Sequence, residues 1–183
     1  MAGIDESRAF QALRIAVLTV SDSRSLEDDR SGDLLVERLT QAGHELAGRA
    51  IVRDDAETIA AQFRAWIEDP GVEVVISTGG TGVTGRDVTP EALAKVAEKE
   101  IPGFGEMFRM ISFQKIGTSA LQSRATAGVA RGTYLFALPG SPGACRDGWD
   151  EILKNQLDIR HRPCNFAELI PRLREHEMPR APA

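Results

Sequence analysis

The stretch VEVVISTGGTGVTGRDVTP, from Val72 to Pro90, joins an apolar run to a loop that is rich in glycine and threonine. Val72–Thr78 is short, β-branched and almost continuously apolar, which indicates a strand buried on both faces of a sheet. Thr89 is a good N-cap and Pro90 suits the first helical position, so a helix is expected from there to about Lys99. Strand, loop and helix in this order are typical of a parallel α/β sheet.

The same alternation continues on both sides of this stretch. Further strands are expected at residues 14–20, 46–52 and 133–138, because these apolar runs have the length of a strand. Helical spacing of apolar residues predicts helices at 32–42, 54–69, 105–115, after PGSPGAC to about 157, and in the tail at 166–173. The sequence therefore predicts a three-layer, doubly wound α/β fold, with a largely parallel sheet and helices on both faces.

The length and composition favour one globular domain. With 183 residues and 42% hydrophobic content, the chain can bury one sizeable core but not two. We expect an N-terminal extension over residues 1–13, a single domain over residues 14–166, and a C-terminal helix and tail over residues 167–183.

The charge and hydropathy pattern argue against two classes of partner. The formal net charge of −5 supplies no general basic field for nucleic acid. No stretch approaches eighteen uninterrupted apolar residues, and the acidic start MAGIDESRAFQAL lacks the apolar segment of a signal peptide. We expect a cytoplasmic protein that binds neither membrane nor nucleic acid, with Cys145 and Cys164 as reduced thiols.

Small and charged residues follow each expected strand. The four loops are Ser21–Arg24, Arg53–Asp55, Thr78–Gly82 and Pro139–Gly143. In open α/β sheets, ligands bind outside the carboxyl ends of the strands, where these loops would converge. Turn formation and helix capping could explain any one of them, but Thr78–Gly82 contains more small residues than a turn requires. Its exposed N–H groups predict a phosphate or carboxylate ligand.

Three common motifs are excluded by their context. Gly80, Gly82 and Gly85 spell the dinucleotide-binding pattern G-x-G-x-x-G, but the helix does not open at these glycines. No Gly-Lys dipeptide occurs, so the chain has no P-loop of the usual type. Ser141 is preceded by Pro139 at the place where a serine hydrolase has the first glycine of its elbow.

Acidic residues beside the expected anion site indicate a divalent cation. Asp54 and Asp87 follow neighbouring strands, and Asp22 is a further candidate. Magnesium uses one or two protein carboxylates and completes its coordination with water and phosphate oxygens. Asp54 and Asp87 are therefore the candidate Mg²⁺ ligands, whereas helix capping is the favoured role for Asp55.

Four stretches together indicate a family: STGGTGVTGRDVTPEAL, IPGFGEMFRMIS, LQSRATAGV and LPGSPGACRDGW. From about Arg14 to Phe166, the chain resembles the MoaB/Mog family of molybdenum cofactor biosynthesis proteins. GTSALQSRA and RHRPCNF are similar to the MoaB branch in particular. This resemblance implies a homotrimer or homohexamer that works with other proteins of the pathway and binds molybdopterin. In the active branch, the enzyme uses Mg-ATP to adenylylate the terminal phosphate of molybdopterin.

The resemblance also implies roles for individual residues. Asp54 and Asp87 match the two essential aspartates of the family, which would act in catalysis and hold magnesium. The matching positions of the binding loops, together with neighbouring residues of the same loops, give the expected ligand-binding set: Ser21, Asp22, Thr78, Gly79, Gly80, Thr81, Gly82, Ser123 and Ser141. Arg86 or Arg124 is expected to stabilise the negative charge of the phosphates.

Two hypotheses of different classes remain open at this stage. One is a molybdopterin adenylyltransferase, and the other is a non-catalytic protein that binds or carries molybdopterin in the same pocket. Both aspartates are present beside an intact TGGTG loop, which favours the enzyme because a carrier needs no magnesium ligands.

Overall fold

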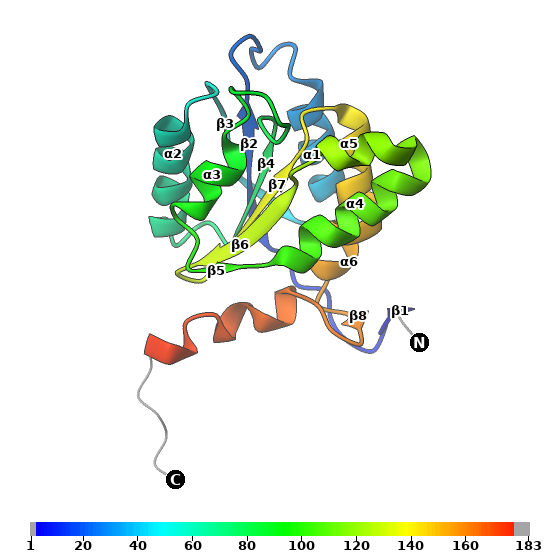
Figure 1. Cartoon of the computed structure of the whole chain (residues 1–183). Coiled ribbons are helices and arrows are strands. Elements are labelled where there is room, and N and C mark those ends of the chain that lie inside the picture. The colour runs from blue at the N-terminus through cyan, green and yellow to red at the C-terminus, as the bar shows by residue number, and fades with distance from the viewer. Residues whose placement is uncertain (1–2, 178–183) are drawn as a thin grey trace.

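The computed structural model describes residues 3–177, and a six-stranded sheet lies at its centre (Figure 1). The strand order is β3–β2–β4–β7–β6–β5, in which β3, β2, β4 and β7 run parallel while β6 and β5 are added antiparallel. The predicted largely parallel sheet is therefore confirmed. The strands are β2 (Arg14–Val20), β3 (Glu45–Val52), β4 (Val74–Thr78), β5 (Lys99–Glu100), β6 (Thr126–Ala130) and β7 (Thr133–Leu138).

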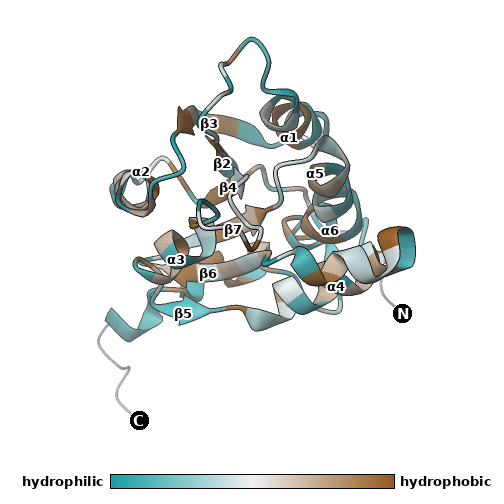
Figure 2. Cartoon of the chain, turned by 45° about the horizontal axis from the view of Figure 1, so that its top comes forward, coloured by the Kyte–Doolittle hydropathy of each residue, from teal (hydrophilic) through white to brown (hydrophobic). Residues whose placement is uncertain are grey.

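Helices cover both faces of the sheet, as the sequence predicts. One face is covered by α1 (Arg30–Gln41), α4 (Pro102–Ile116) and α5 (Pro142–Gly148), and the other by α2 (Ala56–Glu68) and α3 (Thr89–Ala94). A π-helical turn (Trp149–Leu153) continues α5 into the short α6 (Lys154–Gln156). Figure 2 shows hydrophobic residues along the central strands. Within residues 3–177, no helix has the length and apolar content needed to cross a membrane.

Side-chain alternation along β2 divides the core between the two faces. Ile15 and Val17 pack into the cluster that α1 and α4 cover, while Ala16 and Leu18 pack into the cluster beneath α2 and α3. All four side chains are fully buried. This strand therefore stabilises both layers, which explains why its central residues 15–18 are all apolar.

The hairpin of β6 and β7 is not predicted by the sequence. Its two-residue turn is Arg131–Gly132, with φ values of 48° and 89°, which is the backbone form that joins tightly paired strands. β6 has the sequence TAGVA and lacks the large apolar residues that identify a strand. A Cβ on Gly128 would lie 2.9 Å from the Cβ of Ala97, so the strand needs a small residue there.

The helix after the glycine loop differs from the prediction. Val88, not Thr89, is the N-cap of α3, and Pro90 occupies the second helical position. The Thr89 hydroxyl instead donates to the carbonyl of Gly79 at 2.8 Å. The helix ends at Ala94 because the chain must turn to place Lys99 in β5.

The two ends of the described chain pack against the domain. β1 (Gly3–Ile4) pairs antiparallel with β8 (His161–Arg162). The expected tail helix is instead the 3₁₀ helix η3 (Ala167–Arg172), followed by η4 (Glu175–Glu177). Pro171 lies inside η3 and has no N–H to donate, which disfavours a continued α-helix. The remainder of the expected tail, residues 178–183, lies outside the described residues.

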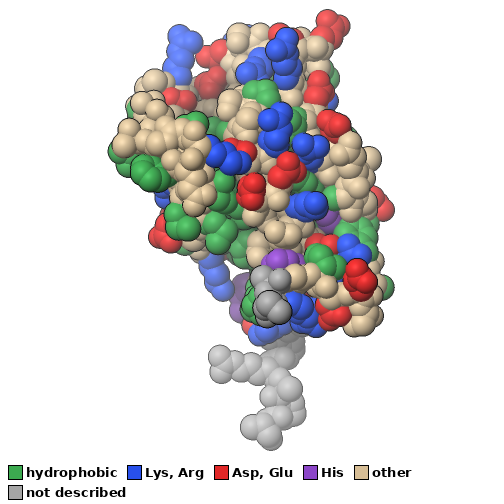
Figure 3. All heavy atoms as spheres, turned by 90° about the vertical axis from the view of Figure 1, so that its right-hand side faces the viewer, with side chains coloured by type: hydrophobic (Ala, Val, Ile, Leu, Met, Phe, Trp, Pro, Cys, Tyr) green, Lys and Arg blue, Asp and Glu red, His purple; other side chains and the backbone are tan. Residues whose placement is uncertain are grey.

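The helix α4 has both a buried and an exposed apolar face. Phe104 and Phe108 are buried in the core, whereas Met107, Met110 and Phe113 are exposed. A group of hydrophobic side chains is visible in Figure 3, on the side of the molecule where the C-terminal end of α4 lies. Only part of the apolar pattern in FGEMFRMISF therefore belongs to the core.

His44 is buried on the same side of the sheet as α1. Its ring lies 5.2 Å from that of Phe10 and 6.1 Å from that of Trp149, measured between centroids. The Nδ1 atom accepts a hydrogen bond from the backbone N–H of Leu13 at 3.1 Å. The folded protein therefore requires Nδ1 to be unprotonated.

This burial predicts a loss of stability in mild acid. Burial lowers the pKa of His44 below its usual value, partly opposed by the negative charges of Asp158 and Glu73. As pH falls below about 6.5, the unfolded chain binds the proton before the folded chain does, so the free energy of unfolding decreases. Urea denaturation between pH 8 and pH 5.5 should detect this decrease.

Two variants test whether His44 causes this decrease in stability. His44→Gln should cost about 1–3 kcal/mol at pH 8 and should make the decrease between pH 7 and pH 5.5 smaller. His176→Gln removes an exposed histidine and should keep the wild-type dependence. An unchanged decrease in His44→Gln would contradict the prediction.

Candidate active site

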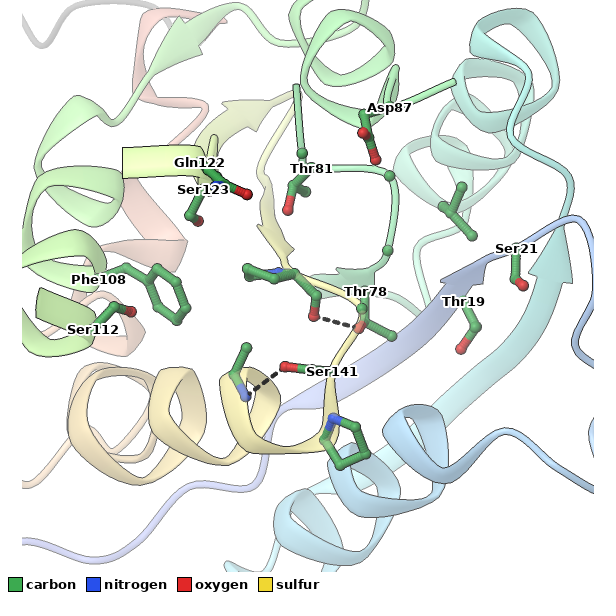
Figure 4. Close-up of a pocket in the computed structure, with 18 of the residues that line it drawn as sticks. Thr19, Ser21, Thr78, Thr81, Asp87, Phe108, Ser112, Gln122, Ser123 and Ser141 are labelled. Carbon is green, nitrogen blue, oxygen red and sulfur yellow. Dashed lines mark hydrogen bonds between the residues drawn. The ribbon is translucent and has the colours of Figure 1, made fainter. Parts of the chain in front are cut away.

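A cleft of about 660 Å³ opens at the carboxyl ends of β2, β4 and β7 (Figure 4). Its floor is formed by the loops that follow these strands. Its remaining wall comes from α4 and from the 3₁₀ helix η1 (Gly117–Gln122). The predicted residues that line it are Ser21, Thr78, Gly79, Gly80, Thr81, Gly82, Asp87, Ser123 and Ser141. Asp22 and Asp54 are not among the lining residues.

Packing against neighbouring segments restricts the backbone of the glycine loop, Thr78–Gly82. Gly79 and Gly80 have φ values of 103° and 64°, a region that favours glycine. A Cβ on Gly79 would lie 2.2 Å from the carbonyl oxygen of Val20, and one on Gly80 would lie 2.4 Å from the Thr89 hydroxyl. The fold itself therefore accounts for two glycines that the sequence suggested were there for a ligand.

Only part of the loop backbone is available to a ligand. The N–H of Gly79 donates to the carbonyl of Leu138 at 3.0 Å. Within residues 3–177, the structure assigns no acceptor to the N–H groups of Gly80 and Thr81. These two groups are the backbone donors that could bind an anion.

Thr81 carries an unpartnered hydroxyl in this loop. The residue is only 2% exposed, and its Oγ1 has no hydrogen-bond partner among the described residues. Figure 4 shows this hydroxyl directed into the cleft. A buried hydroxyl without a partner lowers stability, and a ligand oxygen would supply the missing bond.

Arg86 and Arg124, the arginines expected to bind phosphate, both lie outside the cleft lining. Arg124 donates from Nε to the carbonyl of Gly82 at 2.6 Å and from Nη2 to the carbonyl of Asp87, and it also pairs with Glu91. Its role is to support the loop. The side chain of Arg86 is 83% exposed and donates to Asp22 at 3.1 Å. Neither arginine lines the cleft.

Asp87 and Asp54 have different environments. Oδ2 of Asp87 accepts the Thr84 hydroxyl at 2.6 Å and the Thr84 N–H at 2.8 Å, and these bonds lower the pKa of Asp87. Burial raises the pKa of Asp54, and the negative charges of Asp22 and Asp87 raise it further. The ionised carboxylates of Asp22, Asp54 and Asp87 therefore repel one another, and a bound cation would reduce this repulsion.

The carboxylates at this site suit a cation that takes most of its ligands from water and from a bound phosphate. Within residues 3–177, no group of three or more His, Cys, Asp or Glu side chains is arranged to hold a metal ion. Asp55 is excluded because it caps α2, accepting the N–H of Thr58 at 2.8 Å, as the sequence predicts. Asp54 and Asp87 together match the one or two carboxylates that Mg²⁺ uses beside phosphate oxygens.

The three serines predicted from the sequence line the cleft. The Ser141 oxygen accepts the N–H of Ala144 at 3.2 Å and caps α5, while the Ser123 oxygen accepts the N–H of Ala125 at 3.3 Å. Ser21 accepts the N–H of Arg24 at 3.2 Å. Because each oxygen accepts from the backbone, its hydroxyl proton remains available to donate to a ligand.

Sequence reasoning missed several residues of the cleft. Phe108 and Ser112 come from α4, Ser119 and Gln122 from η1, and Arg24 from the loop after β2. Ser119 and Gln122 fall inside the motif GTSALQSRA, and Arg24 ends the loop SDSR, but nothing local singled them out. The positions of the four residues on α4 and η1 depend on how these two helices return over the edge of the sheet.

Comparisons with known proteins show which family the chain is related to. A family model described as "Probable molybdopterin binding domain" matches residues 16–159. "Molybdenum cofactor biosynthesis protein B" of Escherichia coli (strain K12) is 53% identical over 160 residues, which are 87% of this chain and 94% of that protein. The same-named protein of Bacillus subtilis (strain 168) is 42% identical over 153 residues, covering 83% and 90% of the two chains.

A solved structure shares the fold. The crystal structure of a molybdenum cofactor biosynthesis protein B superposes with a TM-score of 0.83 at 40% identity, covering 93% of this chain and all of that chain. The family model matches most of the chain, and relatives well above 30% identity are covered almost completely. The chain therefore belongs to the MoaB/Mog family of molybdenum cofactor biosynthesis proteins.

Proposed function

We propose that the protein binds molybdopterin and transfers AMP from Mg-ATP to its terminal phosphate. The observation that supports this proposal is a loop with unpartnered donors beside two carboxylates. The Gly80 and Thr81 N–H groups and the Thr81 hydroxyl can bind phosphate oxygens, while Asp54 and Asp87 lie next to the same loop. Such a site fits a reaction between two phosphates.

The reaction requires no nucleophile from the protein. A phosphate oxygen of molybdopterin forms a bond to the α-phosphorus of ATP. The bond from that phosphorus to the bridging oxygen breaks, and pyrophosphate leaves with the electron pair. The attacking phosphate is already ionised near neutral pH, so no general base is needed. The task of the site is to hold two anions in line against their repulsion.

The residues of the cleft can divide this task. Gly80 and Thr81 bind and orient phosphate through N–H and hydroxyl groups, and Ser123 and Ser141 can donate to other polar atoms of the ligands. Asp54 and Asp87 would hold Mg²⁺, which when bound neutralises charge on the ATP phosphates. Arg124 keeps Gly82 and Asp87 in position through their carbonyls.

Loss of Asp87 tests the transferase directly. With molybdopterin, ATP and Mg²⁺, the wild-type protein should form adenylylated molybdopterin and pyrophosphate. Asp87→Asn should reduce turnover at least about 100-fold, while molybdopterin affinity changes only a few-fold because the loop donors remain. Product formation is followed by chromatography, and the variant must keep the wild-type unfolding temperature. Wild-type protein that binds molybdopterin without forming product would instead support a carrier.

Asp54 offers a second test that does not depend on activity alone. Because burial and neighbouring acids raise the pKa of Asp54, its ionised form is less favourable in the folded protein than in the unfolded chain. At pH 7, Asp54→Asn should therefore raise the unfolding temperature by roughly 1–3 °C, while turnover is lost. Asp55→Asn is the matched control: asparagine also caps helices, and the pKa of Asp55 is lowered by its bonds to Thr58, so this variant should keep turnover and should not raise the unfolding temperature. A destabilised or active Asp54→Asn variant would contradict this assignment.

Thr81 and Thr89 are both buried, but they should respond differently to replacement by valine. Thr81→Val removes a hydroxyl without a partner, so stability should stay equal or rise while molybdopterin affinity falls about tenfold. Thr89→Val removes the bond to the carbonyl of Gly79 and should cost about 1–3 kcal/mol. Urea denaturation and titration calorimetry measure these effects. Unchanged affinity in Thr81→Val would remove its hydroxyl from the binding site.

A further inference from the structure

The cleft contains one side chain with a permanent positive charge. Among the described residues that line it, Arg24 is the only lysine or arginine, and Asp87 is the only acid. Arg24 lies in the loop after β2, whereas Asp87 lies in the loop after β4. A phosphate in the cleft would therefore lie near Arg24. The sequence suggested Arg86 or Arg124 for this role instead.

Arg24 is partly anchored and partly available. Its side chain is 34% exposed, and Nη1 donates to the hydroxyl oxygen of Ser31 at 3.2 Å. Ser31 is fully buried and donates in turn to the carbonyl of Gly140 at 2.8 Å, in another loop of the cleft. Within residues 3–177, the structure assigns no acceptor to Nε or Nη2 of Arg24. One nitrogen is held in place while two remain for a ligand.

The charge of Arg24 is not neutralised by a close ion pair. Its nearest carboxylate is that of Asp29, which is fully buried and lies 3.9 Å from Nη1. The other oxygen of Asp29 accepts the Thr19 hydroxyl at 2.6 Å and lies 3.1 Å from Nη2 of Arg49. Asp29 is thus paired more closely with Arg49 than with Arg24. The positive charge of Arg24 remains effective in the cleft.

We propose that Arg24 binds a phosphate group of a substrate, on the side of the cleft formed by the end of β2. The inference rests on the proposed function. A guanidinium group can donate two parallel hydrogen bonds to phosphate oxygens, and such charged bonds are stronger than those from neutral donors. The donors of Gly80 and Thr81 belong to the loop after the neighbouring strand β4. Arg24 supplies charge that these neutral groups lack.

Binding measurements with two ligands test this role and identify the phosphate. Titration calorimetry is performed on the full-length protein with molybdopterin and, separately, with Mg-ATP. Arg24→Gln should weaken binding of one of the two ligands at least about tenfold, and the remaining dependence of affinity on salt should be smaller. Arg24→Lys should give an intermediate affinity, because it keeps the charge but loses the two parallel bonds.

A matched control and the contrary outcomes complete the test. Arg30→Gln removes an exposed arginine at the start of the same helix as Ser31 and should leave both affinities unchanged. Equal affinities of wild-type protein and Arg24→Gln for both ligands would overturn the inference alone. Wild-type protein that bound neither ligand would overturn it together with the proposed function. Adenylyl transfer is not needed for either measurement.

Discussion

The turn at Gly79 and Gly80 is the constraint on which the candidate site depends. The backbone leaves β4 with positive φ at both residues and passes so close to Val20 that no side chain fits. Thr89 then closes the turn from the far side, because its hydroxyl and its N–H bind the carbonyls of Gly79 and Gly80. The core and the start of α3 thus define where the loop donors point before any ligand is present.

The other walls of the cleft are tied to this turn by hydrogen bonds between distant segments. Arg124, which follows η1, binds the carbonyls of Gly82 and Asp87, and Ser31 of α1 binds Gly140 in the loop after β7. These bonds join elements that are far apart in the sequence. Hydrogen-bond donors that are fixed in this way can stabilise negative charge without moving during the reaction. The adenylyl transfer proposed for this MoaB/Mog family member mainly requires such stabilisation.

Two features of the site lower stability. The Thr81 hydroxyl is buried without a partner, and the carboxylate of Asp54 lies close enough to Asp22 and Asp87 for its pKa to rise. Binding of phosphate and a cation would correct both defects. Functional sites commonly retain such local conflicts while the remainder of the fold is locally consistent.

The sequence by itself determined the parallel core and the glycine loop, and it singled out Asp87, which lines the cleft. The apolar runs of β2, β4 and β7 identify buried strands, and ligands of such sheets bind at their carboxyl ends. Only the tertiary structure decided which arginine faces the cleft. Arg24, Arg86 and Arg124 are alike as local patterns, but Arg124 is bound to loop carbonyls, whereas Arg24 is held by Ser31 and lines the cleft. Hydrogen bonds between distant segments decide that choice, and local patterns do not encode which segments meet.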